Sequence, residues 1–162
     1  MTLASSRLLR HEICMEQLKK TGAEIIDFEG VMFFVKYKVG KIGIVYLYHR
    51  GTDNTYLLER VKPYSMLINQ YRKEEEVVTA ITNDIDQFRN AANSKNFPDF
   101  LSVDQDFTKI VRYFEDLYLY YNIDKEDLTL MKDEIKKVVD LILDIKNRSK
   151  RVYYKTEPKS FK

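Results

Sequence analysis

The sequence has few of the residues that cross-link or ligate. Its single cysteine, Cys14, excludes an intramolecular disulfide and is typical of a reducing compartment. Its two histidines, His11 and His49, fall short of the roughly four ligands of a zinc site, although His11 and Cys14 share the spacing of one helix face. We therefore predict no metal and no cofactor, with Cys14 as a small buried thiol.

Long apolar runs and clustered glycines are also missing. No stretch approaches the roughly 18 apolar residues of a membrane span, and residues 1–20 lack the apolar core of a signal peptide. The scattered glycines exclude a P-loop and a dinucleotide-binding fingerprint. The net charge of +2 is too small to imply a polyanion partner for the whole surface. A soluble, cytoplasmic protein is the expectation.

Catalytic motifs are equally scarce. The sequence contains no G-x-S-x-G elbow, and His49 with Asp53 is most simply interpreted as part of a turn. The acidic residues Asp84, Asp86 and Asp104 fit solvated helix faces better than a carboxylate pair for acid–base chemistry. We predict no catalytic residue and no enzymatic activity.

What the sequence does contain is a strong β-hairpin pattern over residues 31–48. Val, Ile, Phe and Tyr fill this stretch and suit a half-buried sheet. Val39-Gly40 is its only break, and a type I′ turn there would place the β-branched Val39 at positive φ. We therefore predict a type I turn over Lys38 and Val39, with Gly40 as a G1 bulge.

The turn type decides which side chains share a face of the sheet. With the bulge, one face combines apolar bodies, polar tips and a lysine: Met32, Phe34, Lys36, Ile42, Ile44, Tyr46 and Tyr48. With a type I′ turn, the tyrosines would instead move to the face of Phe33 and Val35.

The order of elements predicts an α+β fold with an N-terminal helix, a four-stranded antiparallel meander and three further helices. The helix is expected at residues 4–21, the flanking strands at 24–28 and 55–61, and an end to the strands at Pro63. Residues 64–72 fit either a helix or a short fifth strand. Helices should follow from about 74 to 92, from a capping box at Ser102 and from Asp124, the last two as an antiparallel pair. One domain then spans residues 1–150, with the helix and meander in 1–62 and the helical part in 63–150, before a basic tail at 151–162.

The last two helices carry long apolar stripes. Phe107, Ile110, Phe114 and Leu117 share one side of the first, and the second alternates by three and four from Leu128 to Ile145. Such stripes favour packing inside one bundle, and a dimer seam is the alternative.

Two functional hypotheses follow. The first is a non-catalytic binding or regulatory protein that contacts a protein partner, with a second copy of the chain as one candidate. The contact would form through a helix stripe or through the sheet face of Met32, Phe34, Lys36, Tyr46, Tyr48, His49 and Arg50. The alternative is a nucleic-acid-binding protein, because aromatic rings and cations together suit single strands. Its further contacts would come from the tail, at Arg148, Lys150, Arg151 and Lys155.

Overall fold

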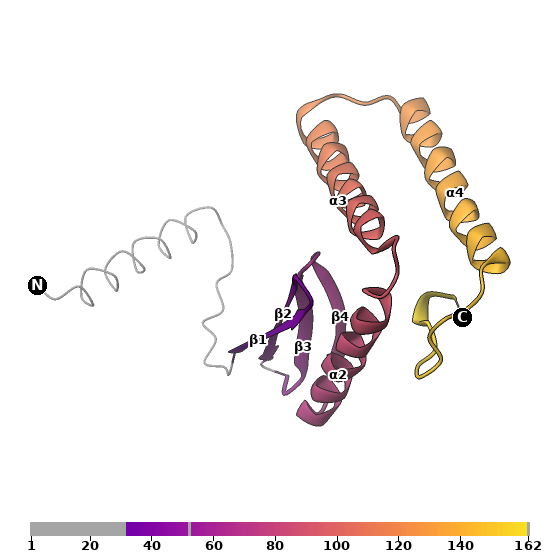
Figure 1. Ribbon diagram of the computed structural model, residues 1–162. Helices are drawn as coiled ribbons and strands as arrows, with labels where there is room; N and C mark the ends of the chain where they lie inside the picture. Colours follow the sequence, from indigo (N-terminus) through magenta and orange to yellow (C-terminus); the bar gives the residue numbers. More distant parts are fainter. Residues whose placement is uncertain (1–31, 52, 162) are drawn as a thin grey trace, which may run out of the picture.

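The structure, a computed structural model, describes residues 32–51 and 53–161. In these ranges a four-stranded antiparallel sheet is followed by three long helices and a short 3₁₀ helix (Figure 1). The predicted α+β class is thereby confirmed for the sheet and the three helices. The predicted helix at 4–21, the strand at 24–28, His11 and Cys14 lie outside the described residues.

The sheet is a meander of β1 (Met32–Val39), β2 (Ile42–Arg50), β3 (Tyr56–Lys62) and β4 (Met66–Tyr71), paired in that order. Pro63 was expected to end the strands, but it lies in the turn between β3 and β4. Residues 64–72, for which the sequence allowed either a helix or a strand, therefore contain the strand β4.

The β1–β2 turn differs from the prediction. Val39 pairs with Ile42, which leaves a two-residue turn of Gly40 and Lys41. Gly40 has a φ of +58° at the first central position, as a type II′ turn requires, and Lys41 does not have a positive φ. The predicted type I turn and G1 bulge are wrong. The physical reason is that glycine takes the strained position, so Val39 stays in the strand at no steric cost.

This register moves the tyrosines to the other face. Tyr46 pairs with Val35, and Tyr48 pairs with Phe33, so all four point to one side. The prediction that the tyrosines share a face with Met32, Phe34 and Lys36 is wrong, because a shift of one residue exchanges the faces of a strand.

Helix α2 (Glu74–Ala91) covers the face of the sheet that carries Tyr46 and Tyr48, which we call the inner face (Figure 1). It begins with the predicted run of glutamates, and Glu76 accepts hydrogen bonds from the backbone N–H groups of Arg72 and Lys73. Buried side chains from the sheet, α2 and the start of α3 form the core, namely Ile44, Tyr46, Leu58, Val77, Ile81, Phe88 and Phe97.

Helix α3 (Phe97–Tyr120) begins earlier than predicted. Residues 93–101 were expected to form a loop, with a capping box at Ser102, but Ser102 lies inside the helix. Pro98 suits the first turn, where its missing N–H would have no partner. Phe97 fixes this turn by packing edge-on against Phe88, with ring centroids 6.3 Å apart.

Helix α4 (Lys125–Arg148) runs back in the opposite direction, so α3 and α4 form a helical hairpin that extends beyond the sheet (Figure 1). The direction agrees with the predicted antiparallel pair. The described residues show no extended interface between the two helices, however, whereas α2 packs against every strand. No described helix is long and apolar enough to cross a membrane.

Candidate functional site

The register divides the predicted sheet-face site between two environments. Met32, Phe34, Lys36 and His49 lie on the outer face, and Tyr46 and Tyr48 lie beneath α2. Arg50 ends β2 and donates a hydrogen bond to Asn54. The structure therefore does not bring these seven residues together on one surface.

Tyr46 is a core residue with no exposed surface. Its hydroxyl donates a 2.7 Å hydrogen bond to Asp84 Oδ2 on α2. Burial, and then the hydrogen bond to the Asp84 carboxylate, raise the pKa of Tyr46 far above its usual range. A phenol held neutral and out of solvent cannot offer its ring to a ligand.

The same carboxylate neutralises Arg60, a cation that is only 3% exposed. Arg60 Nη1 donates to both carboxylate oxygens of Asp84, at 2.8 and 2.9 Å. Its guanidinium carbon lies 4.3 Å from the ring centroid of Tyr64 and 4.9 Å from that of Phe88. Tyr46, Arg60 and Asp84 thus resemble a polar site in composition, but their burial gives them a structural role between β2, β3 and α2.

The outer face of the sheet is only partly apolar. Phe34 and Leu67 are each about 60% exposed and lie in one cross-strand row. Glu59 interrupts this row between them and accepts a hydrogen bond from Ser65. The apolar surface is therefore broken by charge, and the lysines of β1 flank it.

Asp53 makes its hydrogen bonds with residues of its own turn and of the neighbouring strand β4. Asp53 Oδ1 accepts hydrogen bonds from the hydroxyl and the backbone N–H of Thr55, and Oδ2 accepts one from Gln70. The hydrogen bonds from Thr55 hold the pKa of Asp53 below its usual value. Asp53 therefore stabilises the β2–β3 turn.

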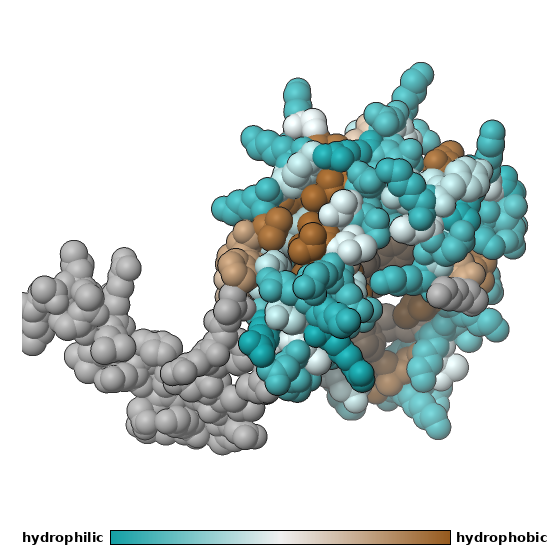
Figure 2. Space-filling model, turned by 90° about the horizontal axis from the view of Figure 1, so that it is seen from below, coloured by the Kyte–Doolittle hydropathy of each residue, from teal (hydrophilic) through white to brown (hydrophobic). Residues whose placement is uncertain are grey.

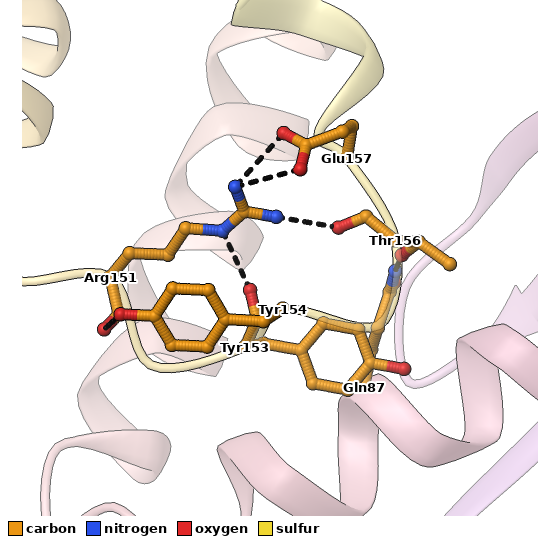
Figure 3. A network of polar contacts seen from close by, with 6 residues as sticks. All are labelled: Gln87, Arg151, Tyr153, Tyr154, Thr156 and Glu157. Atoms are coloured by element: carbon orange, nitrogen blue, oxygen red, sulfur yellow. Dashed lines mark hydrogen bonds and ion pairs between the residues drawn. The ribbon is translucent and has the colours of Figure 1, made fainter.

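The C-terminal tail folds back onto α2 instead of extending away. Gln87 donates to Thr156 at 2.9 Å, and Lys155 lies 2.8 Å from Asp86. Arg151 binds both oxygens of Glu157 and the carbonyl oxygens of Tyr153 and Thr156 (Figure 3).

Three of the four cations of the predicted nucleic-acid surface pair with carboxylates of the protein itself. Arg151 pairs with Glu157 and Lys155 with Asp86, as above, and Arg148 lies 3.3 Å from Asp144. The fourth, Lys150, is exposed between them.

Most of the exposed large apolar side chains among the described residues lie on α3 and α4. After Asp104 every residue of α3 is exposed, and α4 has no buried residue. Figure 2, which views the molecule from below relative to Figure 1, shows apolar side chains in separate patches among hydrophilic ones and others within a recess. We call the exposed apolar residues of the two helices, apart from Phe100 at the start of α3, the hairpin surface: Val103, Phe107, Ile110, Val111, Tyr113, Phe114, Leu117, Tyr118, Leu119 and Tyr120 on α3, and Leu130, Ile135, Val138, Val139, Leu141, Ile142, Leu143 and Ile145 on α4.

A shallow hollow on α3 lies within this surface. Its lining repeats at helical spacing on one side of the helix, at Val111, Phe114, Glu115, Tyr118 and Leu119. Four of the five side chains have large apolar parts, so the hollow suits an apolar side chain from another helix better than a polar metabolite.

Both legs of the hairpin are attached to α2 at their bases. Phe97 and Phe100 of α3 pack with Tyr64 and Phe88, with centroids 5.8–6.3 Å apart. The tail attaches the end of α4 to the same part of α2, at Asp86 and Gln87. The two anchors hold the bases of the helices in place without packing their apolar stripes together.

No group of described residues is arranged to hold a metal ion. None of the protein-family models, curated proteins or solved structures compared with the chain matches it.

The stripes that form the hairpin surface were visible in the sequence, although they were expected to pack against each other. The signal that could have corrected this is their width. Val111, Tyr118, Val139 and Leu141 extend the stripes beyond a single seam, so one neighbouring helix cannot cover them.

Proposed function

We propose that the chain is a non-catalytic binding protein that acts through protein–protein contacts, with the hairpin surface as its binding surface. The observation that carries the proposal is the exposure of almost every large apolar side chain on α3 and α4. An enzyme would need converging polar groups in an accessible pocket. The polar cluster at Arg60 is buried, and the hollow on α3 is apolar.

The size of the hairpin surface supports this function. The largest apolar patch on a typical monomer covers about 300–600 Å². A stable interface buries about 800 Å² on each partner, and one aromatic side chain can bury about 150–250 Å². Eighteen apolar side chains, mostly about half exposed and including five aromatic rings, surround the two helices, so the exposed apolar area is large even though only one side of each helix can enter a single interface.

The chemistry of the hairpin surface selects the kind of partner. Its aromatic and aliphatic side chains lie along helices, with charged residues between them. Apolar helices pack by placing side chains of one into grooves of the other. A protein that presents an amphipathic helix is therefore the expected ligand class.

Site-specific photo-cross-linking tests the proposal. The full chain is expressed with p-benzoylphenylalanine in place of Phe114 in the α3 hollow, or in place of Val152, which is 72% exposed on the tail. We expect irradiation to cross-link the chain labelled at position 114 to another polypeptide. The chain labelled at position 152 should form no such cross-link.

A second control uses the same label with Leu117→Glu and Ile142→Glu, which place charges on both legs of the hairpin. These substitutions should abolish the adduct while leaving the far-ultraviolet circular dichroism unchanged. Equal adducts from Phe114 and Val152, or none from Phe114, would contradict the proposed function.

A further inference from the structure

The sheet and the helix that covers its inner face carry opposite charges. The four strands and the β1–β2 turn contain one acidic residue, Glu59, and six cations: Lys36, Lys38, Lys41, Arg50, Arg60 and Lys62. Helix α2 contains five acidic residues and one arginine. The net charge of +2 therefore averages a basic sheet with an acidic helix, and a polyanion can be attracted to the sheet alone.

Four of these cations gather at one end of the outer face, and we call them the lysine cluster: Lys36, Lys38, Lys41 and Lys62. Val45 pairs with both Lys36 and Lys62, so the two lysines lie in one row across three strands, about 10 Å apart. Lys38 follows about 7 Å along β1, and Lys41 lies in the adjoining turn. All four are exposed and make no hydrogen bond or ion pair with another described residue.

Gly43 lies within the lysine cluster, opposite Lys38. The fold itself does not require a glycine there. Gly43 does not have a positive φ, and a Cβ atom added to it would meet no atom within 4 Å. Glycine inside a strand often marks a place where a ligand approaches the backbone closely. The exposed backbone of Gly43 therefore leaves room for a ligand between the lysines.

Phe34 adds an exposed aromatic ring beside the lysine cluster. It precedes Lys36 by two residues on the same face of β1, and it is 61% exposed. Phe33, on the inner face, stacks on Tyr48, but the ring of Phe34 contacts no other aromatic ring of a described residue. Both sides of the question of charge and of shape thus meet on β1, where a planar group can lie on Phe34 while an anion binds the lysines.

We infer that the outer face of the sheet binds single-stranded nucleic acid, an activity separate from the proposed function of the hairpin surface. The phosphates lie along the lysine cluster and above Gly43, and an unpaired base stacks on Phe34. Proteins that hold single strands without reading their sequence combine cations for the phosphates with aromatic rings for the bases. An acidic peptide would pair with the lysines but would offer no base to Phe34.

Protection of a sheet edge does not explain the whole lysine cluster. Lysines on an edge strand discourage pairing with other chains, and β1 is an edge of the described sheet. That role suits Lys36 and Lys38, but Lys62 lies on β3, between β2 and β4. The acidic residue of the face, Glu59, lies one row away and accepts a 2.7 Å hydrogen bond from Ser65.

Fluorescence anisotropy of the full chain with labelled oligouridine and oligothymidine, each of about 12 nucleotides, tests the inference. Each lysine–phosphate contact on a single strand contributes about −0.7 to the slope of log K against log salt, so four contacts predict about −2.8. Raising the salt concentration fourfold should then weaken binding about 50-fold. Both probes should bind comparably, because phosphates and base faces are common to RNA and DNA.

A matched pair of double variants tests the lysines. Lys36→Gln with Lys62→Gln should make the salt slope shallower by about 1.4, because two phosphate contacts are lost. Lys132→Gln with Lys136→Gln removes the same charge from exposed positions of α4 and should change the slope little.

Two single variants test the rest of the site. Phe34→Ala should weaken binding at least about fivefold through the loss of base stacking. Gly43→Val should weaken binding without lowering the midpoint of urea denaturation, because the added side chain fills open space above the strand.

Absence of binding to both probes at low salt overturns the inference, and so does equal weakening by the two lysine pairs. Binding that Phe34→Ala leaves unchanged, or that oligoglutamate abolishes as effectively as unlabelled oligouridine, would identify a general polyanion site and also overturn it. The chain with Leu117→Glu and Ile142→Glu should bind both probes like the wild type. Loss of the photo-cross-link and loss of oligonucleotide binding are therefore separate results.

Discussion

Arg60 shows how single residues determine the packing of this fold. Its guanidinium is buried, shares one carboxylate with the Tyr46 hydroxyl, and lies against the rings of Tyr64 and Phe88. A buried cation is tolerated only when it is paired, and the pair joins β3 to α2. Tyr46, which the sequence placed in a binding surface, therefore helps to fix α2 on the sheet.

Replacing Asp84 by alanine should lower the free energy of unfolding by about 3–5 kcal/mol, because the buried Arg60 guanidinium loses its counter-charge. Asp86→Ala, two residues further along α2, removes exposed ion pairs with Arg89 and Lys155 and should cost about 1 kcal/mol or less. Urea denaturation of the two variants measures the difference. Equal losses would contradict the structural role of the Arg60–Asp84 pair.

Tyr46→Phe should destabilise the protein by about 1.5–3 kcal/mol at neutral pH, the range for a hydrogen bond to a charged group. Because burial and Asp84 raise the pKa of Tyr46, its contribution is full below the ordinary tyrosine pKa of about 10. The contribution is lost as the pH rises above that value, so the variant and the wild type should become more alike.

Thermal melts of both proteins from neutral pH to pH 11 test this convergence. Tyr154→Phe, at an exposed hydroxyl on the tail, is the control and should change little at any pH. A difference between Tyr46→Phe and wild type that stays constant with pH would be inconsistent with a raised pKa.

Among the elements, the β1–β2 hairpin and the helices could be predicted because their apolar periodicity is strong. The face of the sheet could not, because it depends on where the turn begins: the prediction put Lys38 at the first turn position, and the structure puts Gly40 there. The start of α3 was missed because Pro98 was interpreted as a loop residue, although proline also suits the first turn of a helix. The hairpin surface was found as a pattern, but periodicity identifies the apolar side of a helix and not what covers it.

The position of Gly40 in the β1–β2 turn can be tested directly. Gly40→Ala should lower the free energy of unfolding by about 1–2 kcal/mol, because φ is +58° at this position. Gly43→Ala is the matched control in β2. An added methyl group there meets no atom within 4 Å, so the change should be neutral or slightly stabilising. If chemical denaturation shows both substitutions to be equally mild, the described turn is wrong.

At the scale of the whole molecule, the core and the hairpin surface occupy different elements. The seven buried apolar residues come from β2, β3, α2 and the first residue of α3, and none comes from α4. The sheet and α2 therefore form the stable base. The sheet and α2 leave the apolar stripes of α3 and α4 exposed, and the proposed function is that another chain buries them.

Amide hydrogen exchange of the full chain tests this central claim most directly. In dilute protein, where partners dissociate, we expect amides of α3 after Asp104 and of α4 to exchange much faster than those of β2, β3 and α2. When the protein is concentrated, or the cross-linked partner is added, α3 and α4 should gain protection while the sheet does not change. Amides of α3 and α4 that are as protected as those of β2 in the dilute monomer would contradict the account, because the chain would then cover its own hairpin surface.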